Sequence, residues 1–464
     1  MGTVPIRDNS SGAFAVCDHE FCFIVGERRE EACKILLQTG EYEYSIELGE
    51  NYDILIARKG SWCSYKRRNM KKLNTVFCIL LLAGFSFANP EPFNVPELMQ
   101  TFAGEKITSK AEWESIRAPE LLEKFTTEVY GRRPKVLLDD KRIKFELLDT
   151  CDAMKGTAIR KLVRCRYKGP LGEFIFPFTV FIPKKDHPVP AFVFICNRPA
   201  ENVDPTRAKK SQFWPAEQIV SRGYATATFL FSDIAADNNI NAGFDQGIFS
   251  VVEKSSERIN ESWASLSAWA WAASRIMDWI EKEPLINSKR VGVVGHSRGG
   301  KTALWTAVTD KRFAMTCVNN SGCGGTKLNH INLPKSESID RITKVYPYWF
   351  SSNYKKYANK EMSMDFDTHQ LAALVAPRLL AIASASKDDW AGQLGEWWCA
   401  KLASPAWELY GKKGLVADKM PNVGEAQQEG SISYHYREGK HNLNLHDWNR
   451  YMDFADKHGW RTNL

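Results

Sequence analysis

The chain has 464 residues, and its hydrophobic content of 44% is typical of a large globular protein. Its formal net charge of +7 is spread along the sequence without a basic block, which argues against nucleic acid as the target. Removing the first 88 residues leaves this charge unchanged, because they hold 11 basic and 11 acidic residues.

Residues 70–88 have the order of a secretory signal peptide. Lysines at 71–72 precede an apolar run at 76–83, and small residues at 86 and 88 follow it. The run is shorter than the roughly 20 residues that a membrane-spanning helix needs. We therefore expect a mature chain that begins near Asn89 and is exported, periplasmic or secreted, with no membrane contact after cleavage.

Residues 1–69 precede this segment, although a signal peptide must be N-terminal to work. They show no clear periodic pattern, and their cysteines lack the spacing of a metal site. We interpret them as an upstream extension from a misassigned start codon, outside the mature fold. The alternative is a small domain in its own right. Residues 89–464 hold no internal repeat or linker, so we expect one catalytic domain there.

The mature chain begins with helical residues at 110–130, which end at a turn containing Gly131. Stretches with strand periodicity follow and predict an antiparallel start to a sheet: KRIKFELLD (141–149), AIRKLVRCRY (158–167) and EFIFPFTVFIP (173–183). The short apolar run 191–196 predicts a buried central strand, and residues 213–231 predict a helix, a break at Gly223 and another strand.

Strands then alternate with helices. Apolar residues of segment 259–284 recur at helical spacing on one face. A strand, a turn and a helix follow in RVGVVGHSRGG (290–300), and further strands are expected at 313–320 and 378–386. This order predicts an α/β fold, a three-layer sandwich in which helices cover both faces of a mostly parallel central sheet.

Ser297 lies between a β-branched strand and a helix, which is the context of a nucleophile elbow. The tight turn forces a strained backbone at the serine, and Gly295 and Gly299 avoid side-chain clashes there. The Arg298 backbone N–H at the helix N-terminus would stabilise an anionic tetrahedral oxygen. We predict that Ser297 is the nucleophile; an ordinary turn serine is the alternative.

The base is expected late in the chain, after the acid. His441 lies in a loop between the predicted last strand, SISYHYR (431–437), and the predicted final helix (447–458), where a loop-borne base belongs. His446 is its rival, although its position near the first turn of that helix is typical of a surface or capping residue.

The acid is expected to follow a late central strand. Asp388 and Asp389 come directly after the predicted strand 378–386. A carboxylate there would orient the imidazole and stabilise its cationic form. We choose Asp388 as the acid and interpret Asp389 as a solvated neighbour; the alternative is that both simply end a strand.

Six cysteines remain in the mature chain, and their pairing is open. Export permits disulfides, and Cys151 with Cys165 could link a hairpin, but buried free thiols are an equal alternative. The six are Cys151, Cys165, Cys196, Cys317, Cys323 and Cys399.

Taken together, residues 94–460 resemble the bacterial branch of the glucuronoyl esterases, carbohydrate esterase family 15. The landmarks that carry this resemblance are EVYGRRP, FWP…RGYA, SAWAWAASR, GHSRGGKTALW, NNSGCGG, YPYWF, APRLLAIASASKDDWA and GKHNLNLHDW…YMDFAD. The resemblance implies an α/β-hydrolase esterase that needs no metal and no cofactor. It also implies, as substrate, the ester between 4-O-methyl-glucuronic acid on xylan and an alcohol of lignin. We expect a monomer.

Position by position, the resemblance implies Ser297 as nucleophile, His441 as base and Arg298 as the arginine beside the oxyanion, whose fixed positive charge can steady a developing alkoxide. It also implies contacts to the uronic acid. Lys301, one helical turn after the serine, corresponds to a lysine that binds the sugar hydroxyls, and Trp390 corresponds to an aromatic wall beside the sugar. Glu337 and Trp349 lie in a less well aligned region that supplies further contacts. For Lys301 the alternative is an exposed helix lysine.

The sequence departs from the family at one position. Many members carry a catalytic glutamate within an Asn-Glu-Ser stretch, whereas this chain reads Asn319-Asn320-Ser321. Because Asn320 is neutral, the chain depends on Asp388 as its acid. Two other functions stay open: an acetyl xylan esterase with the same triad, and a catalytically impaired hydrolase that binds carbohydrate.

Overall fold

The computed structural model describes residues 93–238, 243–331 and 333–461, together with strands within residues 3–65. The chain divides into two compact units, Met1–Pro92 and Phe93–Leu464. The expected signal peptide at 70–88 lies outside the described residues. Among the helices that are described, none is both long and apolar enough to cross a lipid bilayer.

The described residues of the first unit form two antiparallel sheets, although we predicted no regular pattern there. Residues 42–48, YEYSIEL, do alternate aromatic or aliphatic with polar residues, which is the period of a strand. The strands are β1 (Thr3–Val4), β2 (Phe14–Asp18), β3 (Phe21–Val25), β4 (Cys33–Thr39), β5 (Tyr42–Leu48), β6 (Ile54–Arg58) and β7 (Ser61–Tyr65).

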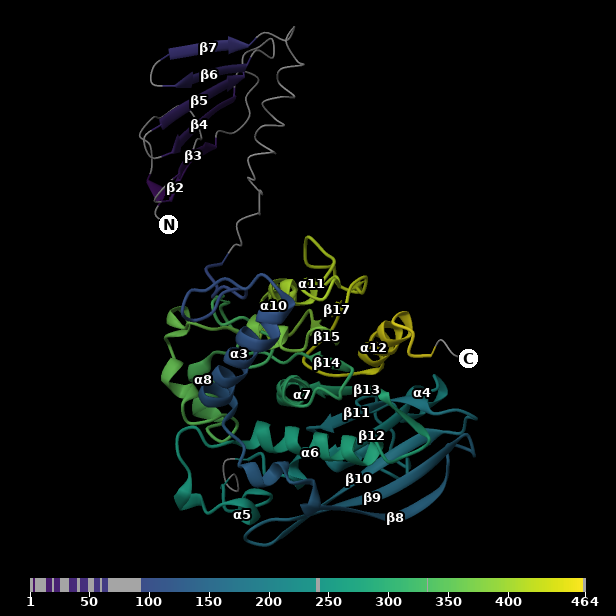
Figure 1. Cartoon of the computed structure of the whole chain (residues 1–464). Coiled ribbons are helices and arrows are strands. Elements are labelled where there is room, and N and C mark those ends of the chain that lie inside the picture. Colours follow the sequence, from purple (N-terminus) through teal and green to yellow (C-terminus); the bar gives the residue numbers. More distant parts are fainter. Residues whose placement is uncertain are drawn as a thin grey trace. The chain divides into compact units, whose positions relative to one another are not determined.

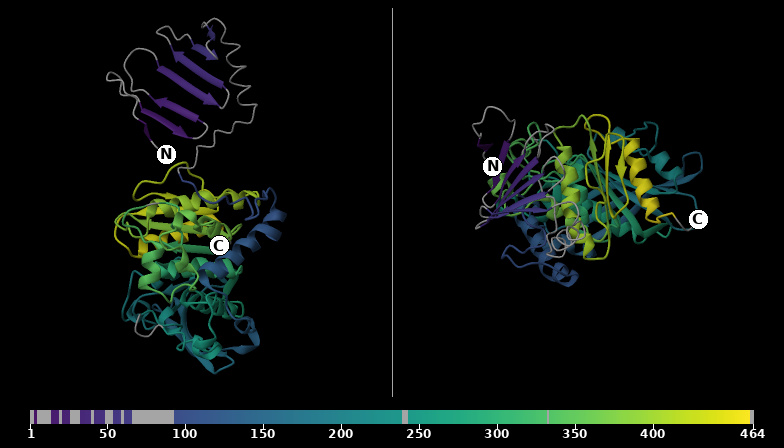
Figure 2. Two further views of the ribbon diagram at one scale, coloured as in Figure 1. Left: turned by 90° about the vertical axis from the view of Figure 1, so that its left-hand side faces the viewer. Right: turned by 90° about the horizontal axis from the view of Figure 1, so that it is seen from above.

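The described part of the second unit contains one ten-stranded sheet, in the order β16-β17-β15-β14-β13-β11-β12-β10-β9-β8 (Figure 1). Its strands are β8 (Ile143–Ala153), β9 (Ala158–Lys168), β10 (Glu173–Pro183), β11 (Val189–Cys196), β12 (Ala225–Leu230), β13 (Ile286–His296), β14 (Met315–Asn319), β15 (Leu379–Ala385), β16 (Ala426–Gln427) and β17 (Ile432–Arg437). Early strands therefore lie at one edge and late strands at the other, as the colour gradient of Figure 2 shows.

The middle of this sheet is parallel, as predicted. Strands β12, β11, β13, β14, β15 and β17 pair in parallel, and β8, β9 and β10 form the antiparallel start. Since the carboxyl ends of parallel strands meet at one edge, the loops that follow β12, β13, β14, β15 and β17 gather there.

Helices cover both faces of the sheet. The larger core includes side chains of α6 (Ser265–Ile280), α7 (Arg298–Thr309) and α10 (Gln393–Ala403), and the second core includes those of α4 (Ala216–Ser221) and α12 (Leu445–Lys457). Successive residues of β11 alternate between the two, since Val193 and Ile195 belong to the first and Phe192 and Phe194 to the second. The predicted three-layer sandwich is confirmed.

Shorter helices complete the unit. The expected helical stretch at 110–130 comprises α2 (Lys110–Glu112), a π-helical turn (Trp113–Arg117), α3 (Ala118–Phe125) and a second π-helical turn (Thr126–Tyr130). It ends at Gly131, whose φ of 81° is in the region that glycine adopts freely. The others are α5 (Phe249–Val252), α8 (Ile339–Val345), α9 (Thr368–Ala373) and α11 (Pro405–Glu408).

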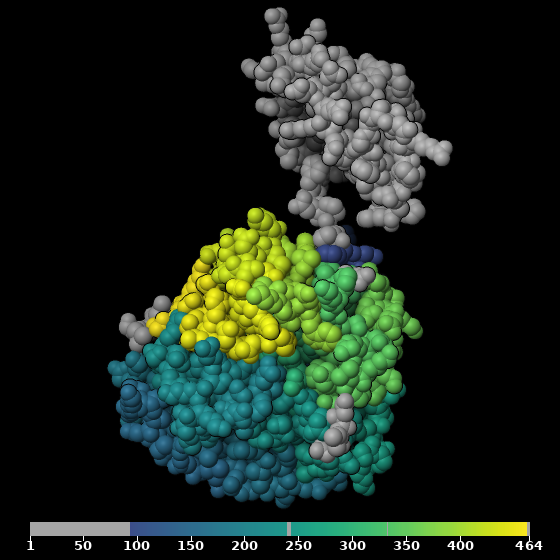
Figure 3. All heavy atoms as spheres, turned by 180° about the vertical axis from the view of Figure 1, so that it is seen from behind, coloured from purple at the N-terminus to yellow at the C-terminus, as the bar shows by residue number. Residues whose placement is uncertain are grey.

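The C-terminal helix α12 closes the second face of the sheet. Arg222 pairs with Asp453 at 2.7 Å, and the hydroxyl of Tyr224 donates to Asp456. In Figure 3 the yellow C-terminal segments accordingly lie directly against teal segments from the first half of this unit. These contacts fix the position of α12, whose first turn follows the loop that carries His441.

Candidate active site

Ser297 occupies a strained turn between β13 and α7. Its φ of 58° and ψ of −126° lie outside the usual regions for a residue with a side chain. The turn is so tight that a Cβ on Gly295 would lie 1.9 Å from the carbonyl oxygen of Gly299. Only glycine fits at 295, and the geometry is that of the predicted nucleophile elbow.

The elbow is anchored to the neighbouring strand β14. The backbone N–H of Ser297 donates to the carbonyl oxygen of Asn319 at 2.8 Å, and Nδ1 of His296 lies 2.6 Å from the side-chain oxygen of the same asparagine. Burial, and secondarily the nearby His441, lower the pKa of His296 well below its ordinary value. His296 is therefore a neutral packing residue at neutral pH.

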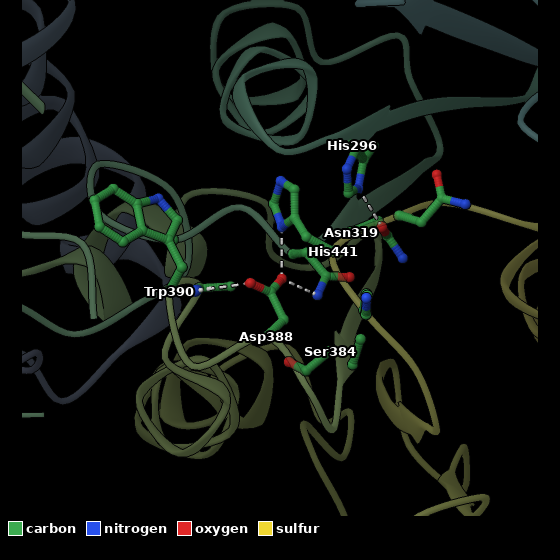
Figure 4. Close-up of polar contacts among 12 residues, drawn as sticks. His296, Asn319, Ser384, Asp388, Trp390 and His441 are labelled. Atoms are coloured by element: carbon green, nitrogen blue, oxygen red, sulfur yellow. Dashed lines mark hydrogen bonds and ion pairs between the residues drawn. The ribbon is translucent and has the colours of Figure 1, made fainter. Parts of the chain in front are cut away.

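His441 and Asp388 meet at this edge of the sheet. The Nδ1–H of His441 donates to Oδ2 of Asp388 at 2.6 Å, and the Asp388 side chain is almost fully buried. The His441 ring packs 4.4 Å, centroid to centroid, from that of His296, the residue before Ser297. Its second nitrogen points away from Asp388 (Figure 4). The acid, the base and the elbow are thus brought to one place.

Backbone hydrogen bonds join the two loops that carry the acid and the base. The N–H of Ser386 donates to the carbonyl oxygen of Arg437 at 2.9 Å, and the N–H of Lys387 donates to that of Gly439 at 2.8 Å. These contacts extend the β15–β17 pairing beyond the strands and set the distance between Asp388 and His441.

The rival residues lie elsewhere. The side chain of Asp389 is 63% exposed and lies 4.0 Å from the ammonium of Lys335. His446 is exposed in the first turn of α12, where its backbone N–H donates to the N-cap residue Asn444. Asp389 is therefore not placed to orient the base, and His446 is not placed to act as the base for Ser297.

Asn320, the departure from the family pattern, contacts the acid directly. Its side-chain amide donates to Oδ2 of Asp388 at 2.6 Å, the same oxygen that faces His441. Its φ of 45° is in the left-handed region that asparagine tolerates better than most residues. The sequence indicated a missing carboxylate here, but it did not indicate that the amide holds another one.

A buried carboxyl group supports the loop that begins at Asn320. Oε1 of Glu396 accepts hydrogen bonds from the backbone N–H groups of Ser321, at 2.7 Å, and Gly322, at 3.1 Å. Its Oε2 accepts from the hydroxyl of Ser384 at 2.7 Å. Complete burial raises the pKa of Glu396 to about 7, and nearby Asp388 adds to this. Glu396 was not predicted from the sequence, because no local pattern in α10 marks it.

Arg298 points along the edge toward Asp237. Its Nε lies 2.6 Å from Oδ2 of Asp237, and Oδ1 of the same carboxylate accepts hydrogen bonds from the hydroxyl of Tyr348 and from Nε1 of Trp349. Asp237 was not predicted, although its place after β12 at the carboxyl edge of the sheet could have indicated it. The carboxylate holds the guanidinium beside the elbow.

Three of the predicted sugar-contacting residues form one cluster. The ammonium of Lys301 lies 2.8 Å from Oε2 of Glu337, and Nε1 of Trp390 donates to Oε1 of the same carboxylate at 3.1 Å. Lys301 also donates to the carbonyl oxygen of Ser321. The alternative of an exposed helix lysine is wrong, because Lys301 is 2% exposed and its ammonium is paired with a buried carboxylate.

The fourth residue, Trp349, lies behind this cluster. Its ring stacks on that of Tyr346 at 3.8 Å and is almost fully buried. The charged groups of Arg298 and Lys301 lie 5.6 and 5.8 Å from its centroid, within the range of cation–π attraction. Trp390 is the one of the four with substantial exposure, at 37%, and the guanidinium of Arg341 lies 5.0 Å from its ring centroid.

The cysteines of the second unit form no disulfide, and the described side chains that could bind a metal form no metal site. The six cysteines of the second unit are free thiols, so the considered link between Cys151 and Cys165 is absent. The register explains this, since Cys151 faces Arg160 and Cys165 faces Phe145. In the described part of the chain, no group of three His, Cys, Asp or Glu side chains could hold a metal ion.

Comparison with known proteins gives a consistent result. A family described as "Glucuronyl esterase, fungi" matches residues 174–411. The chain is 31% identical over 407 residues to "Carbohydrate esterase MZ0003" from an unknown prokaryotic organism, covering 81% of this chain and 92% of that protein.

Solved structures agree. A glucuronoyl esterase from Solibacter usitatus superposes with a TM-score of 0.71 at 31% identity, covering 79% of this chain and 98% of that one. A CE15 glucuronoyl esterase from Teredinibacter turnerae also gives a TM-score of 0.71, at 29% identity, covering 78% of this chain and 89% of that one. Both the fold and the sequence similarity therefore extend over most of the second unit.

Proposed function

The chain belongs to the glucuronoyl esterases of carbohydrate esterase family 15, a family of carboxylic ester hydrolases, and on this premise we propose that Ser297, His441 and Asp388 form its catalytic triad. The observation that carries the proposal is the 2.6 Å hydrogen bond between His441 and Asp388 beside the elbow of Ser297. The substrate is an ester between the carboxyl group of a (4-O-methyl-)glucuronic acid on glucuronoxylan and an alcohol of lignin.

In the first half of the reaction, the Ser297 hydroxyl attacks the ester carbonyl carbon while His441 accepts its proton. The negative charge of the tetrahedral intermediate develops on the former carbonyl oxygen, and the guanidinium of Arg298 and the backbone N–H groups at the start of α7 stabilise it. The bond to the alcohol then breaks, and His441 returns the proton to the alcohol as it leaves.

Water completes the cycle. His441 takes a proton from the water as it attacks the acyl-serine, and glucuronate leaves when the Ser297 oxygen is reprotonated. Asp388 keeps Nδ1 of His441 protonated and stabilises the imidazolium that forms in both halves. Each step therefore depends on the hydrogen bond between these two side chains.

The cluster around Glu337 supports a bulky, polar acyl group. Trp390, 37% exposed, offers aromatic surface on which a sugar ring can pack, and the buried pair of Lys301 and Glu337 holds its indole N–H in place. An acetyl group would not use this surface. We infer that the acyl side of the pocket accepts a uronate.

The test offers the purified protein benzyl glucuronate and, in parallel, two acetyl esters, 4-nitrophenyl acetate and acetylated xylan. Release of benzyl alcohol, with acetate released far more slowly, supports the uronate substrate. Release of acetate alone would assign an acetyl xylan esterase with the same triad. Sugar binding without either activity would assign an impaired hydrolase and overturn the catalytic proposal.

We further propose that the protein is exported and acts on plant cell-wall polysaccharide outside the cytoplasm. The order of residues in segment 70–88 supports this, and residues 1–69 are then no part of the mature enzyme. Mass spectrometry of exported protein should find an N-terminus near Asn89, whereas any peptide from residues 1–69 in mature material would contradict the proposal.

A further inference from the structure

Arg437 is the last residue of β17 and stands directly before the loop that carries His441. Its side chain is 4% exposed. Through Nη1 it donates to the carbonyl oxygen of Glu438 at 3.0 Å, and through Nη2 to those of Lys440, at 3.0 Å, and Asn442. One guanidinium therefore binds the backbone on both sides of His441.

Asp447 fixes this guanidinium in turn. The Nε of Arg437 lies 3.1 and 3.0 Å from the two carboxylate oxygens of Asp447, which is fully buried in the first turn of α12. The same carboxylate accepts hydrogen bonds from Nε2 of His435 at 2.9 Å and from the backbone N–H of Asn444 at 3.0 Å. The contacts link the end of β17 and the start of α12 across the loop.

We infer that Arg437 is a positioning residue for the base, acting through the carbonyl groups next to His441. This inference rests on the proposed triad. The loop spans only a few residues between β17 and α12, and its carbonyl groups turn inward to the guanidinium. Because the backbone is held at residues 440 and 442, the imidazole between them is held against Asp388 and the elbow.

The chemistry requires an arginine. A guanidinium presents five N–H donors in a rigid planar fork, and Arg437 uses them on three carbonyls and one carboxylate at once. A lysine ammonium is a single point with three donors and cannot reach all four acceptors. A shift of the base by 1 Å from the nucleophile can lower turnover about 100-fold.

A matched control exists in the helical layer of residues 110–130. Arg117 is also buried, and it donates to the carbonyl oxygens of Leu98 and Glu97 at 3.1 and 3.0 Å while pairing with Glu120 at 2.6 Å. It thus has the same kind of structural role as Arg437, but in a segment that contains none of the residues of the proposed triad.

The experiment compares Arg437→Lys with Arg117→Lys, using kcat and KM for benzyl glucuronate and the rate at which a fluorophosphonate labels Ser297. Melting temperature and circular dichroism establish the folded fraction. We expect both variants to have a lower melting temperature than the wild type. Only Arg437→Lys should lose kcat and labelling rate, each about 100-fold per folded site, with KM changed less than threefold.

The inference is overturned if folded Arg437→Lys keeps its labelling rate within threefold of the wild type, or if Arg117→Lys loses as much. If Arg437→Lys does not fold, Asp447→Asn replaces it in the test, because this variant keeps the shape of the side chain but removes the charge that holds the guanidinium. We expect its labelling rate to fall about tenfold, and an unchanged rate refutes the inference. Failure of the proposed function would give a different result. If the substrate is wrong, the wild-type protein releases no benzyl alcohol, and the labelling rates of Ser297 still decide the role of Arg437.

Discussion

The side-chain amide of Asn320 donates a 2.6 Å hydrogen bond to Asp388, on the carboxylate oxygen that also faces His441. Sequence comparison with the family pattern marks Asn320 as a lost acid. In the structure Asn320 is a hydrogen-bond donor that holds the proposed catalytic acid, Asp388. An amide beside this carboxylate binds it, whereas a second carboxylate in the same place would repel it.

The first prediction concerns this amide. Asn320→Asp adds a second carboxyl group beside Asp388, and the added negative charge favours the protonated, inactive form of His441. The acid limb of the pH profile of kcat/KM should therefore move upward by about one pH unit. Asn442→Asp adds the same charge one residue from His441 but in an exposed position, and should leave the limb in place. Equal shifts would show that Asn320 has no special coupling to the acid.

The two neighbouring aspartates should differ sharply. Asp388→Asn removes the charge that orients and stabilises the imidazolium, so kcat for benzyl glucuronate should fall by about 10³ to 10⁴. Asp389→Asn changes a side chain that is 63% exposed, and should leave kcat unchanged. Losses of similar size in the two variants would reverse the assignment of the acid.

The pair Lys301–Glu337 is nearly fully buried, with side chains 2% and 5% exposed. Removing one partner leaves the other charge buried without its counterion, so Lys301→Met should lower the free energy of unfolding by about 3 to 5 kcal/mol. Adding Glu337→Gln to it should restore part of this loss. Urea unfolding of the two single variants and the double variant measures the coupling, and strictly additive losses would mean that the charges do not interact.

Glu396 gives a prediction about pH. Because burial raises its pKa from 4.5 to about 7, the folded protein keeps this proton between about pH 4.5 and 7 while the unfolded chain releases it. The stability contributed by Glu396 is therefore complete at low pH and falls as pH rises through that range. Glu396→Gln cannot ionise and keeps an acceptor for Ser321.

The difference in unfolding free energy, Glu396→Gln minus wild type, should thus rise between pH 5 and pH 7.5, by up to about 3 kcal/mol. Chemical denaturation at several pH values measures it. Other titrating groups cancel in the difference, so a value that does not change with pH would show that Glu396 ionises as it does in the unfolded chain.

Much of the fold was predictable because local patterns and the sheet agree. The alternation in 141–183 predicted the antiparallel strands β8 to β10, and the order of strands and helices after residue 190 predicted the parallel sheet between two helical layers. The two-residue strand β16 carries too short a pattern to be recognised. The strands at 3–65 were missed although one of them, Tyr42–Leu48, alternates clearly.

The site was predictable where the chain itself marks it. Gly295 and Gly299 around Ser297 identify the elbow, and the strand that precedes Asp388 places a carboxylate at the edge of the sheet. Two of the supporting residues were not predictable. Glu396 acts on the backbone N–H groups of Ser321 and Gly322, 75 and 74 positions away, and Arg437 acts on backbone carbonyl groups. Neither relation leaves a local pattern in the sequence.

The most direct test of the triad compares His441→Ala with His446→Ala in the release of benzyl alcohol from benzyl glucuronate. We expect kcat to fall by at least about 10³ in His441→Ala, because Ser297 loses the base that activates it, and the folded His446→Ala variant to keep wild-type turnover. Turnover that survives in His441→Ala, or is lost in His446→Ala instead, would contradict the convergence of residues 297, 388 and 441.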